Sequence, residues 1–536
     1  MKKQNVLKGS IILMISAAAS KGFGALFKIP LTNLLGGVGM SYFSCAYSLF
    51  LPIYSLTVTG LSSAVARMTA QSAALGMYSN IRRIRRTALL MFTGAGLVGS
   101  AAVCLLAYPF SLLSTGGAEA VPALLMIAPA VLFGCVTAVE RGCCEGMSNM
   151  YPTAFSQAAE GAIKVAAGLW LCGYVNSHGS RLMEYFPAVT DIRALSAAAG
   201  ILGVSVSSFG AVLFFAVLAA FRRPLRGGEE HLCPRRETAR ELAATALPVG
   251  VSSLVTNLTS LVDMWTITAC ISHFGCGREL PPSVAAEDIP NFVYGSFAGI
   301  ALTVFNLVPS VTNMLGKGAL PSITAAWAEH DRAALEAGTF QALVTAAVIA
   351  VPSAFGLGTL APGVLHLLFP LQNDEAEICI SALRLLMPGM VCLCLSFPVF
   401  SLLQAVGKPS APLKIMLMGT VLKLVGNLVL VPLIGADGAA VSTSVCYAAV
   451  LAVSLAAYIR AAGVPLPAAA LVKVLYAGTM CGGAAILTNG ICRRAGTSEL
   501  AAVTASVTAG ALMYLISLIL LSLGKIKKAA IPENCR

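Results

Sequence analysis

The segment at residues 20–36, SKGFGALFKIPLTNLLG, indicates the fold, because it sets two lysines and a proline inside an apolar run. It belongs to an apolar window at 9–33. A membrane helix needs about 20 such residues. Pro30 does not argue against a span, since membrane helices tolerate proline and often kink there. We therefore predict a transmembrane helix at this place.

Similar windows recur along the whole chain. Their approximate cores are 9–33, 40–64, 88–112, 121–140, 153–175, 195–220, 243–270, 291–316, 340–369, 378–403, 413–433, 438–459, 468–489 and 499–523. The sequence therefore predicts an all-α polytopic membrane protein with about 14 transmembrane helices.

The composition excludes an ordinary soluble domain. Of the 536 residues, 57% are hydrophobic and only 11% are charged, whereas soluble chains carry roughly 25% charged residues. Mean hydropathy is +0.84. The net charge of +12 would raise nucleic-acid binding in a soluble protein, but here the positive residues fall between the apolar runs. We expect no nucleic-acid partner.

Cysteine and histidine spacing predicts no cofactor site. The 16 cysteines are scattered, mostly inside apolar runs, and the five histidines are far apart. Neither pattern fits a disulfide framework or a zinc site. No Walker motif is present, so ATP does not drive the protein directly. We expect neither catalysis nor a metal.

Basic residues alternate between the connections. One set comprises Lys2, Lys3, Lys8, Arg82, Arg83, Arg85, Arg86, Arg222, Arg223, Arg226, Arg235, Arg236, Arg240, Lys408, Lys525, Lys527 and Lys528. With fourteen spans these all fall on one side, and the opposite loops hold fewer basic residues. By the positive-inside rule both termini are cytoplasmic, in a multi-pass protein of the bacterial inner membrane.

A repeat crosses the longest polar connector. Residues 164–171, KVAAGLWL, resemble 423–430, KLVGNLVL, and each is the fifth span of a group of six. Parallel repeats of this kind are common in transporters. We predict two pseudo-symmetric six-helix lobes at 1–222 and 241–462, a cytoplasmic linker at 223–240, and two further helices with the tail at 463–536.

A few charges lie inside the predicted spans. They are Lys21, Lys28, Glu160, Lys164, Asp263 and Lys423. Each costs about 2.5–3.5 kcal/mol on insertion scales, so such residues usually face water or a ligand. The positives outnumber the negatives, and we expect the surplus to face water, a headgroup or an anionic ligand.

Four lysines, Lys21, Lys28, Lys164 and Lys423, are the candidate cavity cations that would bind an anionic cargo. Lys21 and Lys28 are seven residues apart and share one helix face. An ammonium binds phosphate as a point charge, although Lys28 could instead extend to the interface near its helix end. Lys21 and Lys423 have no acid within one turn on their own helices. We expect both to face a shared, water-filled cavity.

The acids allow two interpretations each. Glu160 and Lys164 are four residues apart and can pair, either as a structural pair or as part of the site. Asp263 either binds a coupling cation, H⁺ or Na⁺, or neutralises a lysine of the opposite lobe.

Three stretches resemble a known family. Residues 20–36 are similar to the first helix of the stage V sporulation protein B group, within the multidrug/oligosaccharidyl-lipid/polysaccharide flippase superfamily. Residues 145–154, EGMSNMYPTA, resemble its turn between helices four and five, and 294–301, YGSFAGIA, followed by 320–324, LPSIT, its helix eight. The chain departs from relatives at Lys28, often arginine there, and at 295–297, where the lipid II flippase branch carries an arginine.

The resemblance implies a V-shaped pair of lobes around a central cavity. It also implies flipping of an undecaprenyl-diphosphate-linked saccharide, a peptidoglycan or polysaccharide precursor, in sporulation or growth, by a monomer among membrane lipids. One alternative is a cation-coupled multidrug exporter of the same superfamily, which would favour an acidic, aromatic cavity. A membrane-embedded glycosyl or phosphosugar transferase should instead show clustered acids in its loops.

Overall fold

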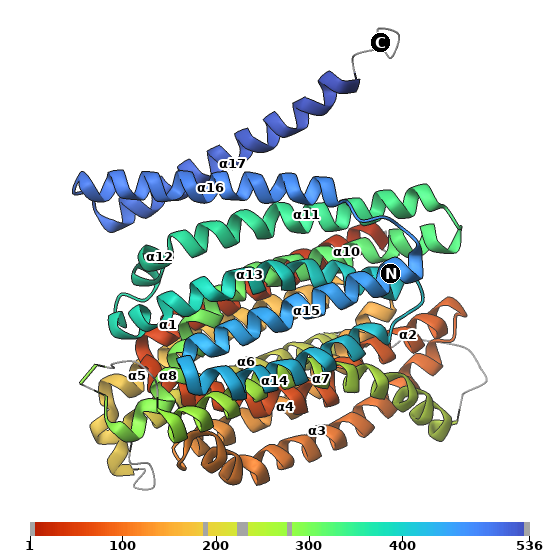
Figure 1. Cartoon of the computed structure of the whole chain (residues 1–536). Coiled ribbons are helices and arrows are strands. Elements are labelled where there is room, and N and C mark those ends of the chain that lie inside the picture. Colours follow the sequence, from red (N-terminus) through yellow and green to blue (C-terminus); the bar gives the residue numbers. More distant parts are fainter. Residues whose placement is uncertain (1–5, 186–190, 222–233, 276–280, 283, 530–536) are drawn as a thin grey trace. The chain divides into compact units, whose positions relative to one another are not determined.

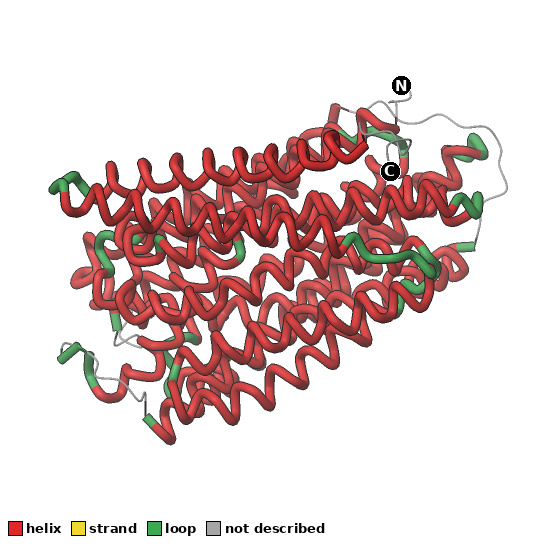
Figure 2. The backbone as a smooth tube through the Cα atoms, turned by 45° about the horizontal axis from the view of Figure 1, so that its top comes forward, coloured by secondary structure: helices red, strands yellow, loops and turns green. Residues whose placement is uncertain are grey.

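The computed structural model describes residues 6–185, 191–221, 234–275, 281–282 and 284–529, and this part of the chain is helical without a strand (Figure 1). Short connections join most consecutive helices (Figure 2). The chain packs as two compact units, Met1–Gly299 and Ile300–Arg536. We describe each unit by itself.

The first unit holds the helices up to the middle of η3. They are α1 (Val6–Tyr54), η1 (Ser55–Thr59), α2 (Gly60–Ala74), α3 (Tyr78–Thr115), α4 (Val121–Gly146), α5 (Tyr151–Tyr185), α6 (Ile192–Phe221), α7 (Arg235–Phe274), η2 (Ala286–Asp288), α8 (Ile289–Ser296) and η3 (Phe297–Ala301). One core cluster joins α2, α3 and α4 through Leu61, Ile84 and Val139, all of which are buried.

The second unit holds the remaining helices. They are α9 (Leu302–Phe305), α10 (Leu307–Ala328), α11 (Arg332–Thr359), α12 (Ala361–Leu368), α13 (Asn373–Ala405), α14 (Ala411–Ile434), α15 (Ala436–Ala462), α16 (Ala468–Arg494) and α17 (Glu499–Ala529). Leu402 and Tyr458 belong to its largest described core, and the Tyr458 hydroxyl lies 2.6 Å from that of Thr339. Helices α16 and α17 form a hairpin (Figure 1).

Helix α1 covers the first predicted window and the first part of the second, with a break between them. Gly36 at the break has φ 65° and ψ −175°, a backbone conformation that suits glycine because it has no Cβ. The second half then packs closely on α8: a Cβ at Gly295 would overlap the Gly37 carbonyl oxygen. The break therefore brings two backbones into contact at this end of the unit.

Two π-helical segments interrupt long helices. Segment η1 separates α1 from α2, and η3 follows α8. Helix α7 packs against the first of them, where a Cβ at Gly250 would stand 2.6 Å from the Leu56 carbonyl oxygen. Single π turns inside α-helices frequently mark functional sites.

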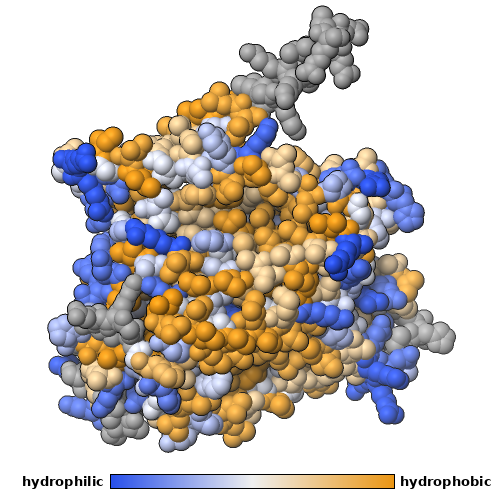
Figure 3. Space-filling view, viewed as in Figure 1, coloured by the Kyte–Doolittle hydropathy of each residue, from blue (hydrophilic) through white to orange (hydrophobic). Residues whose placement is uncertain are grey.

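The helices suit a membrane. Ten helices of the described chain are long and apolar enough to cross one, or eleven if the bent pair Ala286–Phe305 and Leu307–Gly316 is one span. Apolar side chains cover the middle of the helices of each unit, and hydrophilic ones gather toward their ends (Figure 3). The protein is therefore a multi-pass membrane protein.

All fourteen predicted windows lie on helices, although 291–316 and 340–369 each contain a break. The number of spans and the lobe boundaries stay predictions, because compact packing does not test a repeat. Most of the predicted linker at 223–240, namely residues 223–233, lies outside the described residues.

Candidate functional site

Lys28 lies half-buried on α1 and contacts the π-helical segment η3. Its ammonium donates a hydrogen bond to the Ala298 carbonyl oxygen at 2.9 Å. One turn later, the Thr32 hydroxyl lies 3.3 Å from the Gly299 carbonyl oxygen. No carboxylate of the described residues lies within ion-pair distance of Lys28. Its positive charge therefore lacks an acidic partner there.

Lys164 comes to the same turn of α1 from α5. Its ammonium lies 5.4 Å from the centroid of the Phe27 ring, within the range of a cation–π interaction. A Cβ at Gly161 or Gly168 would crowd the Phe23 or Phe27 ring. Small residues on both sides of Lys164 thus let α5 approach α1 closely.

Glu160 is paired with a residue that the sequence windows missed. Its carboxylate lies 2.7 Å from the Arg141 guanidinium of α4 and accepts a 3.2 Å hydrogen bond from Ser208 of α6. Arg141 also donates to the Ser156 hydroxyl at 3.0 Å. Glu160 therefore joins α4, α5 and α6. It forms an ion pair with Arg141 on a neighbouring helix, whereas the predicted partner was Lys164 of its own helix.

Asp263 is buried on α7, with 3% of its surface exposed. It lies close enough to Tyr294 of α8 to interact with it electrostatically. An acid at this depth is consistent with both predicted roles, cation binding and neutralisation.

For the other two predicted lysines, Lys423 and Lys21, the structure does not test a site shared with Lys28. Lys423 lies on α14 in the other unit and is only 2% exposed, while the Ser442 hydroxyl donates to its carbonyl oxygen at 3.1 Å. The backbone of Lys21 lies in α1, but its side chain lies outside the described residues. A cavity shared by Lys21 and Lys423 stays a prediction.

A polar cluster joins α1, α6 and α8 at the end of the first unit where α1 breaks. Arg193 at the start of α6 lies 2.7 Å from the carboxylate of Asp288 and 3.0 Å from that of Asp191. The Ser41 hydroxyl of α1 donates to the Asn291 side-chain oxygen at 2.9 Å. We call Ser41, Asp191, Arg193, Asp288 and Asn291 the outer cluster, because the charge pattern of the sequence predicts that this end faces outward.

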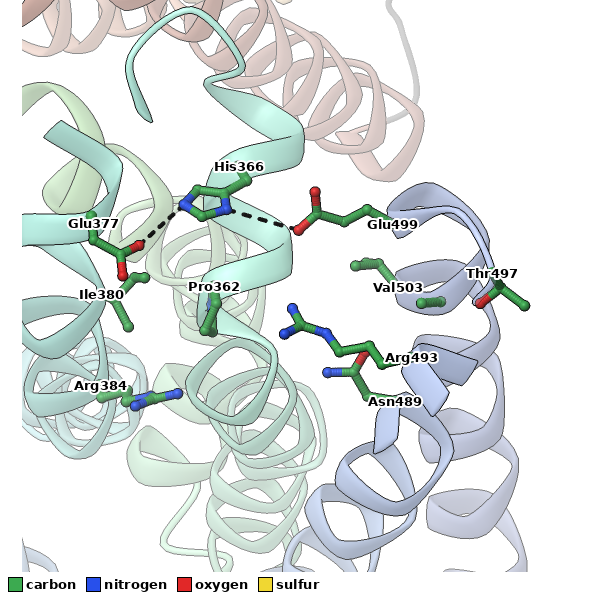
Figure 4. A pocket seen from close by; sticks show the side chains of 11 residues that line it. Pro362, His366, Glu377, Ile380, Arg384, Asn489, Arg493, Thr497, Glu499 and Val503 are labelled. Carbon is green, nitrogen blue, oxygen red and sulfur yellow. Dashed lines mark ion pairs between the residues drawn. The ribbon is translucent and has the colours of Figure 1, made fainter. Parts of the chain in front are cut away.

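A pocket of about 640 Å³ lies in the second unit between α12, α13 and the α16–α17 hairpin (Figure 4). His366 stands between Glu377 and Glu499, with ring nitrogens 3.3 Å and 3.8 Å from the two carboxylates. Arg384 and Arg493 line the same pocket. Because cations and acids are mixed here, the pocket favours an anionic ligand less than an all-cationic site would.

The described residues contain no group of three or more histidine, cysteine or acidic side chains that could hold a metal. Sequence reasoning overlooked Arg141 and Glu140, and it used Arg85 only as an orientation signal, although Arg85 and Glu140 form an ion pair at 2.6 Å. All three lie just beyond or at the edge of the predicted windows. Their signal was a charge within one turn of an apolar run.

Comparison with protein families gives two long matches. A family model described as Polysaccharide biosynthesis protein matches residues 6–326. A second, described as Lipid II flippase MurJ, matches residues 188–506. Together they extend over nearly the whole chain.

Two similar proteins come from Bacillus subtilis (strain 168). The chain is 21% identical over 466 residues to Lipid II flippase MurJ, covering 83% of this chain and 81% of that one. It is 22% identical over 447 residues to Stage V sporulation protein B, covering 82% and 81%. Both relatives are matched over most of their length.

Solved structures share the fold. The structure titled Lipid II flippase MurJ, inward closed conformation, gives a TM-score of 0.69 at 14% identity over 97% of this chain and all 100% of that chain. An inward-facing multidrug resistance MATE family transporter of the MOP superfamily gives 0.63 at 14% identity, covering 85% and 98%. At this identity the likeness shows the fold alone.

Proposed function

The chain belongs to the polysaccharide biosynthesis protein family, in the superfamily of multidrug, oligosaccharidyl-lipid and polysaccharide flippases, and on this premise we propose that it moves a polyprenyl-diphosphate-linked saccharide from the inner to the outer leaflet. The saccharide is a peptidoglycan or polysaccharide precursor. The named relatives, a lipid II flippase and a sporulation protein, support this class of cargo.

Lys28 carries the proposal. Its ammonium lies within a span and is held by a backbone carbonyl, which satisfies a hydrogen bond but leaves the charge uncompensated. A diphosphate would compensate it, since its negative charge adds a Coulomb attraction that a neutral carbonyl oxygen does not supply. The cargo would thus compete with the Ala298 carbonyl for Lys28, and its binding would release α1 from η3.

The transport cycle needs no covalent chemistry. We infer that the outer cluster closes the outer end while the headgroup binds from inside, and that it separates when the outer end opens. The polyprenyl tail stays in lipid while the headgroup crosses. Either Lys21 and Lys423, as expected from the sequence, or Lys164 beside Phe27 would supply further positive charge to the cargo.

Export of organic cations is the second candidate function. The one observation in its favour is Asp263, an acid buried in α7. An exporter of cations needs such acids to dominate the site. The positive charge of Lys28 favours an anionic cargo instead, and Asp263 would then serve the coupling cation.

The test is flipping in liposomes. The full chain is reconstituted with a fluorescent lipid-linked saccharide, and reagent accessibility of the outer leaflet reports its arrival. We expect Lys28→Ala to lower the rate by at least tenfold and Lys28→Arg to retain part of it, because charge matters more here than geometry. Lys473→Ala is the matched control, since the Lys473 ammonium of α16 also donates to a helix carbonyl, that of Leu521, at 3.1 Å.

Unchanged flipping in Lys28→Ala would reject the role of Lys28. Absence of flipping in the unaltered protein, together with efflux of a labelled organic cation from the same liposomes, would reject the cargo class in favour of the exporter.

A further inference from the structure

Four arginines line one cavity at the start of α3. The cavity has a volume of about 760 Å³, and Arg82, Arg83 and Arg86 of α3 line it together with Arg235, the first residue of α7. Ser79, Thr87, Leu89 and Leu90 complete the lining. We call these residues the arginine pocket.

The neighbouring Arg85 shows what the pocket arginines lack. Arg85 belongs to the same basic run but has a carboxylate partner in Glu140 at 2.6 Å. For the four pocket arginines, the described part of the chain offers no carboxylate within ion-pair distance. One arginine of the run is thus used for structure, and the others are available to a ligand.

Arg83 supplies a second, independent sign of a missing partner. Its Nε atom is buried and has no hydrogen-bond acceptor among the residues that the structure describes. Buried polar groups are nearly always paired in native proteins, and an exception points to an unseen ion, water or ligand. Four guanidinium groups around one cavity also repel one another unless an anion lies between them.

The chemistry of the lining specifies the ligand. Guanidinium groups match phosphate oxygens with paired hydrogen bonds, and the Ser79 and Thr87 hydroxyls can add donors. The other wall is apolar and opens to the lipid-facing side of α3, where Leu90 is 74% exposed. A ligand that satisfies both walls has a phosphate head and a hydrocarbon tail.

We propose that the arginine pocket binds the phosphate headgroup of an anionic lipid in the leaflet that the charge pattern places inside. Basic clusters at this depth attract anionic lipid, and this cluster is a formed cavity shared by two helices. A bound phosphate joins the start of α7 to the start of α3. The site is separate from Lys28, which lies on α1, so it does not depend on the proposed role of Lys28.

Two sources can supply this phosphate: an anionic phospholipid of the bilayer, or the diphosphate of a polyprenyl lipid. Native mass spectrometry of the full-length detergent-solubilised protein distinguishes them. The protein is titrated separately with phosphatidylglycerol, with a short-chain polyprenyl diphosphate and with phosphatidylcholine, and the bound fraction is counted.

The test variant is Arg83→Gln/Arg86→Gln, and the matched control is Lys408→Gln/Arg460→Gln. The control removes the same charge from exposed residues that the sequence places on the same membrane side. We expect the test variant to lose affinity for one or both phosphate lipids by at least about tenfold, a change of about 1.4 kcal/mol, and the control to lose little. The lipid with the larger loss is the source.

Arg235→Gln keeps the test decisive if the double variant does not fold, because Arg235 is exposed at the helix start and its loss leaves α3 intact. We expect it to weaken phosphate-lipid binding by a factor of a few. Equal binding of phosphatidylcholine, or equal loss in the pocket and control variants, would overturn the proposal.

Discussion

Arg141 and Glu160 show how charges are tolerated inside the first unit. Their charged atoms lie 2.7 Å apart, with 14% and 26% of the side chains exposed. Arg85 and Glu140 form a second pair of this kind. Pairing lowers the cost of a charge in an apolar environment. Lys28, which has a carbonyl oxygen as its partner, therefore differs from these structural charges.

We expect Arg141→Gln to destabilise the protein by about 1–3 kcal/mol, because it leaves the half-buried Glu160 carboxylate without its cation. Thermal unfolding in detergent measures the change. Glu160→Gln should cost a similar amount.

A double-mutant cycle isolates the pair. The variant Arg141→Gln/Glu160→Gln should lose less stability than the sum of the two single variants, since no lone charge remains. Strict additivity would show that the two side chains contribute independently and that the contact is not an energetic pair.

Spacing along the chain could identify Lys28 but not its partner. A lysine inside an apolar window stands out in any sequence, whereas Ala298 lies 270 residues away and contributes only a backbone oxygen. Arg141 was missed because its window ended at residue 140 while α4 continues to Gly146. Because its charge is paired with Glu160, Arg141 can lie on the same helix beyond the apolar run. Hydropathy alone does not detect such a pair.

At the scale of helices, the outer cluster is the candidate gate. Arg193 of α6 binds Asp288 next to α8, and Ser41 of α1 binds Asn291 of α8. The cluster lies where the break at Gly36 turns α1 toward α8. Breaking one ion pair there should favour separation of these helices without disturbing their cores.

We expect Arg193→Gln to open the outer end. Ser41 is fully buried, so a cysteine in its place should react slowly with a membrane-impermeant thiol reagent applied from outside. In the Ser41→Cys/Arg193→Gln variant the labelling rate should rise severalfold, because the bond to Asp288 no longer holds α6 to α8.

The control for this experiment is Ser41→Cys/Arg181→Gln, which removes an exposed arginine near the end of α5. A further variant that lacks the exposed Cys104 shows how much of the labelling comes from that native cysteine. Equal labelling in both double variants would show that the Arg193 ion pairs do not hold the outer end closed.

Helices were more predictable from the sequence than their interruptions. Twenty-residue apolar runs predict helices because a backbone in lipid must satisfy its own hydrogen bonds. The π-helical segments η1 and η3 depend on contacts with distant helices, such as Gly250 against the Leu56 carbonyl. No local pattern encodes such contacts, so the place where Lys28 binds η3 could not be predicted.

At the scale of the whole molecule, hydropathy and charge carry different information. Apolar windows predicted the all-helical membrane fold, and the family matches confirm its class. Orientation across the membrane is a separate property, because a helical bundle packs in the same way whichever end faces the cytoplasm. Only the distribution of Lys and Arg among short connections decides it.

The last prediction concerns this orientation. The connections on the predicted inner side carry Arg82, Arg83 and Arg86, which have no acidic partner among the described residues. On the predicted outer side Arg193 is bound by two aspartates. The anionic lipids of the inner leaflet attract each of these unpaired arginines by about 1 kcal/mol, which favours keeping them on the inner side. An even number of spans then places both termini in the cytoplasm.

A phosphatase that is active only outside the cytoplasm should therefore be inactive when fused after Lys528 and active when fused after Gly116, between the third and fourth predicted spans. Activity at Lys528 would reject the topology, and inactivity at both positions would reject the span count before Gly116.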